Sequence, residues 1–295
     1  NREDLINTIF RISPTLTPIL NMASKTTATN TLHEWQTQDL AAPAANAQLE
    51  GDAAVAKIVT PTVRLNNKTQ ISTKTVIVSG TQQAMNPAGR KNEMSYQLAM
   101  AAAELKRDME LGLTQNSVTA ATPRQSRGLV GWAGDNADGA TAGTAYVAPN
   151  YVTNVAQTDG TQIAFTEARL KNVLQKVFVA GGNPDTVMLP PLGKQTFSTF
   201  TGNSTRFDKG EDQKLYAAVD VYVSDFGELK AMPNRFQRAR DVFVLEMAKI
   251  AVAYLRPFNT IELATTGDAI QRELVVEYCM EMRAPKAHGI IADIL

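Results

Sequence analysis

Few side chains in this chain are of the types that usually carry out catalysis or bind metal ions. The two histidines, His33 and His288, lie near opposite ends of the 295-residue sequence. No partners for a zinc site or a Ser-His-Asp triad can be identified for either of them. The single cysteine, Cys279, has no neighbouring base that would activate a thiol. We therefore interpret all three as structural side chains.

Three short sequences imitate functional motifs but lack the residues that complete them. Asp225-Phe226-Gly227 copies the magnesium-binding tripeptide of protein kinases, yet no glycine-rich loop, strand lysine or His-Arg-Asp accompanies it. It is better explained as a turn between two strands. Gly89-Arg90-Lys91 lacks the frame of a phosphate-binding loop. Asp135–Gly139 lacks the acidic spacing and the final glutamate of a calcium loop. The sequence therefore predicts no cofactor, no metal and no recognisable active site.

The charge balance argues against tight binding to nucleic acid. Lys plus Arg and Asp plus Glu number 29 each, and no large segment is basic. Nucleic-acid-binding domains usually show a concentrated basic surface, so we expect only weak, non-specific contact with DNA. The chain is 44% hydrophobic and 20% charged, as in soluble globular proteins. A single cysteine excludes an intrachain disulfide, and no apolar run is long enough to cross a membrane.

The chain begins with segments that have no apparent core of their own. Residues 1–12 predict a short amphipathic helix in which Leu5, Ile9 and Phe10 share one stripe. The chain then remains polar and rich in Thr, Ala and Asn as far as Gly51. We expect this stretch to be an extended arm that must pack against something else.

Two β-rich runs, Val55–Leu65 and Ile71–Ser79, flank the polar segment Asn66–Lys68. This order predicts a hairpin with its turn at that segment. Pro61 cannot donate a backbone hydrogen bond, which places the first run at a sheet edge. A two-stranded hairpin is at best marginally stable alone in water. We therefore expect the hairpin to lie against a neighbour, and deletion of Asn66–Lys68 to leave a soluble core that assembles poorly.

The rest of the chain predicts a mixed α+β fold. The clearest helix is expected between Gly89 and Asn116, where apolar residues follow the 3.6-residue period. A second helix is predicted at Thr166–Ala180, and a short buried strand at Thr186–Leu189. With further strand-like runs, these make a compact unit over residues 163–258. The last expected strand is Glu273–Arg283, which alternates between apolar and charged residues.

Short segments spread over nearly the whole chain carry a family resemblance. In order they are Thr17–Leu20, His33–Thr37, Ala47–Asp52, Ile71–Gln82, Gly89–Met94, Glu104–Asp108, Val223–Gly227, Leu255–Phe258, Thr266–Asp268 and Ala287–Gly289. Together with the order of arm, hairpin, long helix and α+β unit, they resemble the major capsid proteins of tailed bacteriophages, which have the HK97-like fold.

The resemblance implies an α+β capsid fold of four parts. Residues 1–50 would be an N-terminal arm, 51–89 an extended β-hairpin loop, 90–162 a peripheral domain built on the long spine helix, and 163–258 an axial domain. Residues 259–295 would return to the peripheral or axial sheet. The residues expected at assembly interfaces are Leu5, Ile9, Phe10, Trp35, Lys57, Arg64, Asn66, Asn67, Lys68, Lys74, Arg90 and Glu93.

The resemblance also implies a structural protein and not an enzyme. Copies would form the pentamers and hexamers of an icosahedral shell around double-stranded DNA, in a virion assembled in the host bacterial cytoplasm. Portal and scaffolding proteins, and decoration proteins, would be its partners, and a membrane would not. Some relatives crosslink covalently through a loop lysine, but no partner asparagine can be matched here, so no crosslinking is expected. The nearest alternative is an encapsulin-like nanocompartment shell; an enzyme with an unrecognised carboxylate site is a distant one.

Replacing Leu5 and Ile9 together with alanine tests the role of the arm, because it removes the apolar stripe and keeps the chain length. We expect the yield of assembled shells to fall by about tenfold or more, since each lost aliphatic side chain removes about 1.5–3 kcal/mol of burial. Sedimentation of the expressed protein measures the yield. An unchanged yield would reject a role of the arm in assembly.

Overall fold

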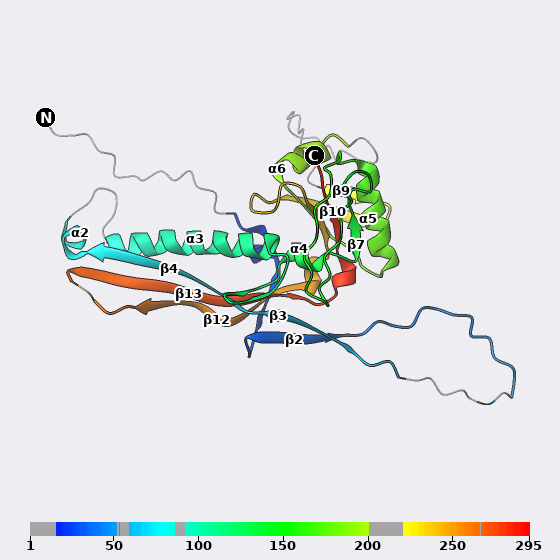
Figure 1. Ribbon diagram of the computed structural model, residues 1–295, viewed down its shortest axis with the longest axis horizontal. Helices are drawn as coiled ribbons and strands as arrows, with labels where there is room; N and C mark the ends of the chain where they lie inside the picture. The colour runs from blue at the N-terminus through cyan, green and yellow to red at the C-terminus, as the bar shows by residue number, and fades with distance from the viewer. Residues whose placement is uncertain (1–15, 52, 54–58, 86–91, 201–220, 266) are drawn as a thin grey trace, which may run out of the picture.

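The computed structural model of the chain describes residues 16–51, 53, 59–85, 92–200, 221–265 and 267–295. The molecule is elongated and has three parts (Figure 1). A long four-stranded sheet with a helix along it forms the platform. A second sheet with its helices forms the compact unit at one end of the platform. A hairpin projects past the compact unit, away from the free end of the platform.

The platform is a sheet of strand order β1-β12-β13-β4. Its strands are β1 (Ser24–Thr27), β12 (Ile250–Glu262), β13 (Ala269–Met282) and β4 (Gln70–Ser79). β13 pairs antiparallel with both β12 and β4, whereas β1 runs parallel to β12. The predicted final strand is confirmed in β13, which begins four residues earlier than the expected start at 273.

The long helix α3 (Glu93–Gln115) covers one face of the platform and confirms the helix predicted for this region. The Asn92 side chain begins it by accepting a hydrogen bond from the Ser95 N–H. Its apolar stripe is buried, with Leu105 and Met109 fully inaccessible to solvent. At about 1.5 Å per residue the helix is about 35 Å long, which matches the length of the long strands beneath it.

The compact unit is a six-stranded sheet of order β7-β14-β11-β8-β10-β9. Its elements are β7 (Asn136–Asp138), β14 (Gly289–Ile291), β11 (Val242–Leu245), β8 (Thr186–Leu189), β10 (Gly227–Pro233) and β9 (Val221–Ser224), with the helices α5 (Glu167–Val179) and α6 (Pro191–Phe197). The predicted helix at 166–180 and the strand at 186–189 are confirmed. The turn proposed for Asp225 and Phe226 does join β9 to β10.

The remaining elements are short. They are α1 (Pro18–Met22), α2 (Gly80–Ala84), α4 (Leu129–Trp132), β5 (Ala120–Ala121), β6 (Arg124–Gln125), the 3-10 turns η1 (Met247–Lys249) and η2 (Pro285–Ala287), and the two hairpin strands β2 (Leu32–Thr37) and β3 (Val63–Lys68).

The strand pairing expected for the hairpin is wrong. β3 and β4 follow one another in the chain with only Thr69 between them, but they do not pair. β3 pairs antiparallel with β2, and β4 pairs with β13. The segment Asn66–Lys68 is therefore part of a strand and not a turn, and the hairpin that projects spans residues 32–68 instead of 51–89. Of the polar residues that suggested a turn, Asn67 makes side-chain hydrogen bonds to distant parts of the chain.

Two other expectations need correction. β12 begins at Ile250 and belongs to the platform, so the compact unit does not extend to residue 258 as one segment. It is completed by β14 near the C-terminus, which pairs with β11, and by β7, which pairs with β14. The stretch before Gly51 is not wholly an arm, since β1 adds to the platform and Ile19 is fully buried. The helix predicted for residues 1–12 lies outside the described residues.

One hydrophobic cluster joins the platform to the compact unit. Leu105 of α3 and Met280 of β13 belong to the same buried cluster as Met188 of β8 and Phe243 of β11. A second cluster lies between α5 and the other side of the six-stranded sheet. Because side chains from both parts share a core, the platform and the compact unit form one body.

Glu110, in the middle of α3, fixes the entry of the chain into this body. Its fully buried carboxylate accepts hydrogen bonds from the backbone N–H groups of Ile19, at 2.9 Å, and Leu20, at 3.1 Å. It also accepts one from the Asn234 amide at 2.8 Å. Burial raises the pKa of this carboxyl, and the three hydrogen bonds oppose that shift. A carboxylate of the helix thus caps the first turn of α1.

Replacing Glu110 with alanine leaves these buried donors without an acceptor. We expect the free energy of unfolding of the unassembled protein to fall by about 3 kcal/mol, because each unsatisfied buried polar group costs about 1–3 kcal/mol. Chemical denaturation followed by circular dichroism measures the loss. Lys106→Ala, at an exposed position of the same helix, is the control and should change stability by less than about 0.5 kcal/mol. Equal stability of the two variants would contradict the role of Glu110.

Candidate assembly interface

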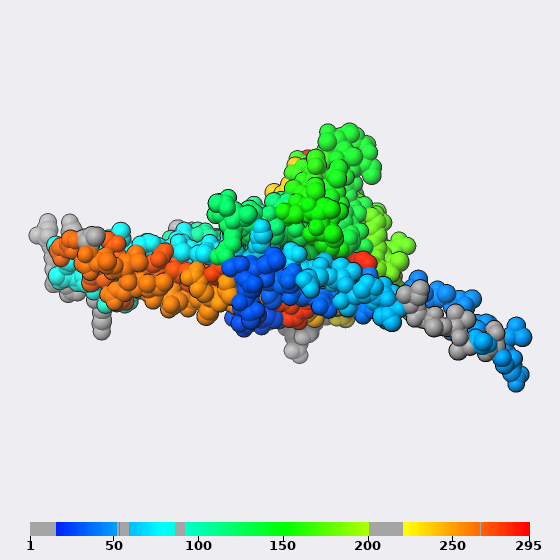
Figure 2. All heavy atoms as spheres, turned by 60° about the horizontal axis from the view of Figure 1, so that its bottom comes forward, coloured from blue at the N-terminus to red at the C-terminus, as the bar shows by residue number. Residues whose placement is uncertain are grey.

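The hairpin exposes apolar side chains that its own molecule leaves uncovered. β2 and β3 pair from Leu32 with Lys68 to Thr37 with Val63. Beyond them lies a loop whose described residues, 38–51, 53 and 59–62, extend away from the body as a thin projection (Figure 2). Within the described part of this loop, Leu40 is 97% exposed and Leu49 is 81% exposed. Large aliphatic side chains so fully exposed in a projecting loop indicate a surface that another molecule covers.

The base of the hairpin is held rigidly by Asn67, which is fully buried. Its amide nitrogen lies within hydrogen-bond distance of the Met280 carbonyl, at 2.7 Å, and of the Arg127 carbonyl, at 2.9 Å. Its amide oxygen accepts from the Arg127 N–H at 2.9 Å. One side chain therefore connects β3 to β13 and to the segment that precedes α4.

Aromatic and charged contacts hold β2 against the same strand, β13. The Trp35 indole N–H donates to the Met282 carbonyl at 2.9 Å, and the Trp35 ring lies 5.5 Å from that of Trp132. The Glu281 carboxylate lies 3.0 Å from His33 Nε2 and accepts a hydrogen bond from Arg283. Burial acts to raise the pKa of Glu281, but the hydrogen bonds outweigh it, so this pKa lies below its ordinary value. The carboxylate is thus ionised where the hairpin meets the platform.

A buried ion cluster lies where the hairpin passes into the platform. Glu277 of β13 is 3% exposed and accepts from Arg124 at 2.6 Å and from Arg256 at 2.8 Å. It also accepts a hydrogen bond from the Thr69 hydroxyl at 2.8 Å. Two guanidinium groups thus satisfy one buried carboxylate, so removing Glu277 would leave both arginines without this partner.

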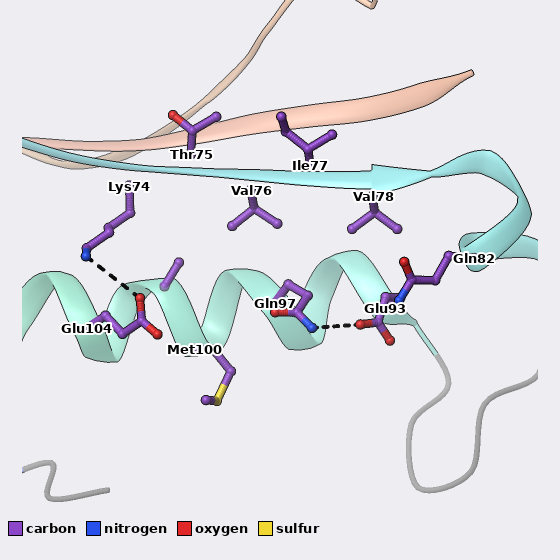
Figure 3. A pocket seen from close by; sticks show the side chains of 11 residues that line it. Lys74, Thr75, Val76, Ile77, Val78, Gln82, Glu93, Gln97, Met100 and Glu104 are labelled. Atoms are coloured by element: carbon purple, nitrogen blue, oxygen red, sulfur yellow. Dashed lines mark hydrogen bonds and ion pairs between the residues drawn. The ribbon is translucent and has the colours of Figure 1, made fainter. Parts of the chain in front are cut away.

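Toward the free end of the platform, no described element covers the face of the sheet opposite α3. Ile71 and Ile77 of β4 point to this face and are 45% and 61% exposed. Ile261 of β12 shares it by strand register and is 40% exposed. Val76 and Val78 instead turn toward α3 (Figure 3). The alternation in β4 thus separates a face that serves the core from a face left open.

The carboxylates that could suggest catalysis are engaged in structural ion pairs. Asp293 near the C-terminus accepts from Arg240 at 2.6 Å, and Arg238 contacts both Asp159 and Asp241. Burial raises the pKa of Asp241 to about 7. These contacts attach the final residues to the compact unit. Within the described residues no group of three His, Cys, Asp or Glu is arranged to hold a metal ion, and no helix is long and apolar enough to span a bilayer.

The structure separates the residues that the sequence assigned to interfaces. Leu5, Ile9, Phe10, Lys57 and Arg90 lie outside the described residues. Asn67 is buried at the base of the hairpin, Glu93 is 2% exposed in the first turn of α3, and Lys74 is paired with Asp108 at 2.9 Å. These three residues contribute to the fold of their own molecule. Trp35 and Lys68 are half-buried at the base, and Arg64 and Asn66 are exposed on β3.

Sequence reasoning missed the polar residues that position the hairpin. No local sequence pattern indicates the roles of Glu277, Glu281 and Arg124, because the partners of these residues are distant in the chain. The charged side of the predicted strand 273–283 was the only available indication, since carboxylates on a strand otherwise buried must find partners.

Solved phage capsids contain chains with this same fold. A chain of the cyanophage A-1(L) capsid asymmetric unit matches with a TM-score of 0.68 and 16% identity, over 100% of this chain and 97% of that one. A chain from the capsid of a native GTA particle also matches with a TM-score of 0.68, at 9% identity, over 100% of this chain and 96% of that one. The α+β fold is therefore that of the HK97-like capsid proteins.

The sequence assigns the family. The family model of the SU10 major capsid protein matches residues 1–295, and the chain belongs to this family. The major capsid protein of Escherichia phage Phieco32 is 27% identical to it, over 97% of this chain and 92% of that protein. The chain is a structural protein of a tailed phage, the subunit of an icosahedral shell, and not an enzyme. The encapsulin-like alternative is not favoured.

Replacing Asn67 with alanine should loosen the base of the hairpin, because the Met280 and Arg127 carbonyls and the Arg127 N–H lose their partner. We expect a loss of about 2–3 kcal/mol in unfolding free energy. Asn66→Ala is the matched control, since the neighbouring side chain is exposed; it should change stability by less than about 0.5 kcal/mol. Thermal unfolding of the unassembled variants compares them. A larger effect at position 66 would contradict this assignment.

Deletion of Asn66–Lys68, expected from the sequence to spare the core, should therefore damage it instead.

Proposed function

We propose that the hairpin of each copy lies over the platform of the adjacent copy in the shell. In this assignment residues 32–68 are the extended loop, the platform is the peripheral domain and the compact unit is the axial domain. The observation that carries the proposal is that one chain exposes two separate apolar surfaces, one on the loop and one on the platform. The loop has Leu40 and Leu49 exposed, and the open face of the platform has Ile71 and Ile77 exposed.

The direction of the hairpin supports contact between copies. It projects past the compact unit, whereas the open platform extends the opposite way (Figure 1). A loop attached at this base therefore points away from the platform of its own molecule. A contact between two different surfaces of identical subunits is heterologous, and it closes into a ring when the rotation between subunits allows. Rings of five and six copies around the axial domains fulfil this condition.

The net charge of the chain is consistent with a shell that encloses DNA without binding it tightly. The formal net charge of the chain is zero. A strongly basic lining would add salt-dependent binding to phosphates, which scales with the number of neutralised charges. We infer that double-stranded DNA is packaged with weak, non-specific contact, and that assembly takes place in the host bacterial cytoplasm. Portal and scaffolding proteins, and decoration proteins, are the further partners that we propose.

Replacing Leu40 and Leu49 together with serine tests the proposal, because both side chains are exposed and their loss should leave the monomer intact. We expect shell yield to fall by about tenfold or more, since burial of each leucine on a neighbour contributes about 1.5–3 kcal/mol. Negative-stain microscopy and sedimentation measure assembly. Ala42→Ser with Ala47→Ser, at exposed positions of the same loop, is the control. Normal shells from the leucine variant would reject the role of the loop.

A further inference from the structure

A groove of about 290 Å³ runs between β4 and α3 toward the free end of the platform (Figure 3). One wall is formed by α3, through residues spaced by three to four positions: Glu93, Gln97, Met100 and Glu104. The other wall is formed by β4, and Gln82 of α2 contributes at one end. Small-molecule sites usually enclose about 300–1,000 Å³, so this groove lies at the lower limit for them.

The wall on β4 consists of consecutive residues, Lys74 through Val78. Their side chains alternate: Lys74, Val76 and Val78 point toward α3, while Thr75 and Ile77 point away from it (Figure 3). Side chains on opposite faces of a strand cannot all line one groove. Thr75 and Ile77 therefore line the groove with their backbone.

The edge in question is the free edge of the sheet. β4 is the outermost strand, and among the described strands it pairs with β13 alone. No residue of β13 lines the groove. The backbone groups of β4 that point away from β13 thus pair with no described strand, and they belong to the strand that forms one wall of the groove. This combination of a strand edge and a flanking helix is how several peptide-binding domains accept an extended peptide as an added strand.

The chain also contains a segment whose composition favours a strand, although its described part belongs to no sheet. Between Val55 and Thr62, five of eight residues are β-branched, the type most enriched in strands. Its described part, Val59–Thr62, is exposed and lies outside any strand, with Val59 85% exposed. Pro61 lacks an N–H and suits a strand that pairs along one edge only. We call these four described residues, Val59–Thr62, the limb; it leads directly into β3.

We propose that the limb Val59–Thr62 of a second copy binds in this groove as an additional strand on the free edge of β4. The inference rests on the proposed overlap of hairpin and platform, and adds that the contact is made by main-chain pairing and not by side chains alone. The limb and the groove lie toward opposite ends of the molecule (Figure 1), so the limb that fills a groove comes from another copy.

Charge in the groove is compatible with this occupant. Lys74 is paired with Asp108 at 2.9 Å and lies 3.9 Å from Glu104, and the Glu93 carboxylate accepts a hydrogen bond from Gln97 at 2.7 Å, so these charged groups already have partners within the molecule. The described limb carries no charged residue. A neutral, β-branched segment enters without leaving an ion unpaired, which a strongly charged peptide would not do.

Cysteine crosslinking tests the pairing directly. The native Cys279 is fully buried and will not interfere. Thr75→Cys is combined in turn with Val59→Cys, Thr60→Cys or Thr62→Cys, and assembled shells are mildly oxidised. Cβ atoms directly opposite one another in paired strands are about 4.5–5.5 Å apart on one face. We expect a ladder of linked chains for either Val59 or Thr60 but not for both. Thr75→Cys alone should give no ladder.

Hydrogen exchange of the wild-type protein is the second measurement. Alternate backbone amides of residues 74–78 should exchange at least about tenfold more slowly in shells than in unassembled subunits, since an added strand protects the outward-facing groups. Shells in which these amides show no added protection would overturn main-chain pairing, as would shells that link equally at positions 59 and 60. Both results would leave the proposed overlap of hairpin and platform standing. That overlap fails separately if the leucine variant assembles normally.

Discussion

The strand β13 is the element on which the rest of the molecule depends, because three separate parts are attached to it. Its backbone pairs with β12 on one side and β4 on the other, so it forms the middle of the platform. The Met280 carbonyl accepts a hydrogen bond from the Asn67 side chain of the hairpin, and the Met282 carbonyl accepts one from Trp35. Its acidic residues, Glu277 and Glu281, lie buried or nearly so among arginine and histidine partners. β13 is thus apolar on one face and ionic on the other. It holds the projecting hairpin through hydrogen bonds and ion pairs, which require specific partners, and not through apolar burial alone.

The sequence predicted those elements whose structure is determined locally. The helices α3 and α5 and the strand β8 lie where hydrophobic periodicity and capping residues indicated them. Local patterns report which face of an element is apolar, but in β4 both faces carry aliphatic residues, so the sequence did not indicate which of them is buried. The family was also within reach, because the order of these elements is itself specific. None of this information states which strand pairs with which.

The hairpin shows why strand pairing escaped prediction. Asn66-Asn67-Lys68 has the composition of a turn, and turn-forming residues are usually exposed. Asn67 is polar for a different reason, since it satisfies the backbone of two segments, one close to residue 127 and one close to residue 280. Such a role depends on chain segments brought together only by the complete fold. The bonds of Glu110 to the first turn of α1 are equally remote in sequence.

Thr69 alone separates β3 from β4, and it is fully buried with its hydroxyl bound to Glu277. The hairpin and the edge of the platform are therefore one continuous length of backbone without a hinge at their junction. Where neighbouring copies of the icosahedral shell meet at different angles, we infer that this junction does not bend, so every subunit keeps the same shape at the base of its hairpin.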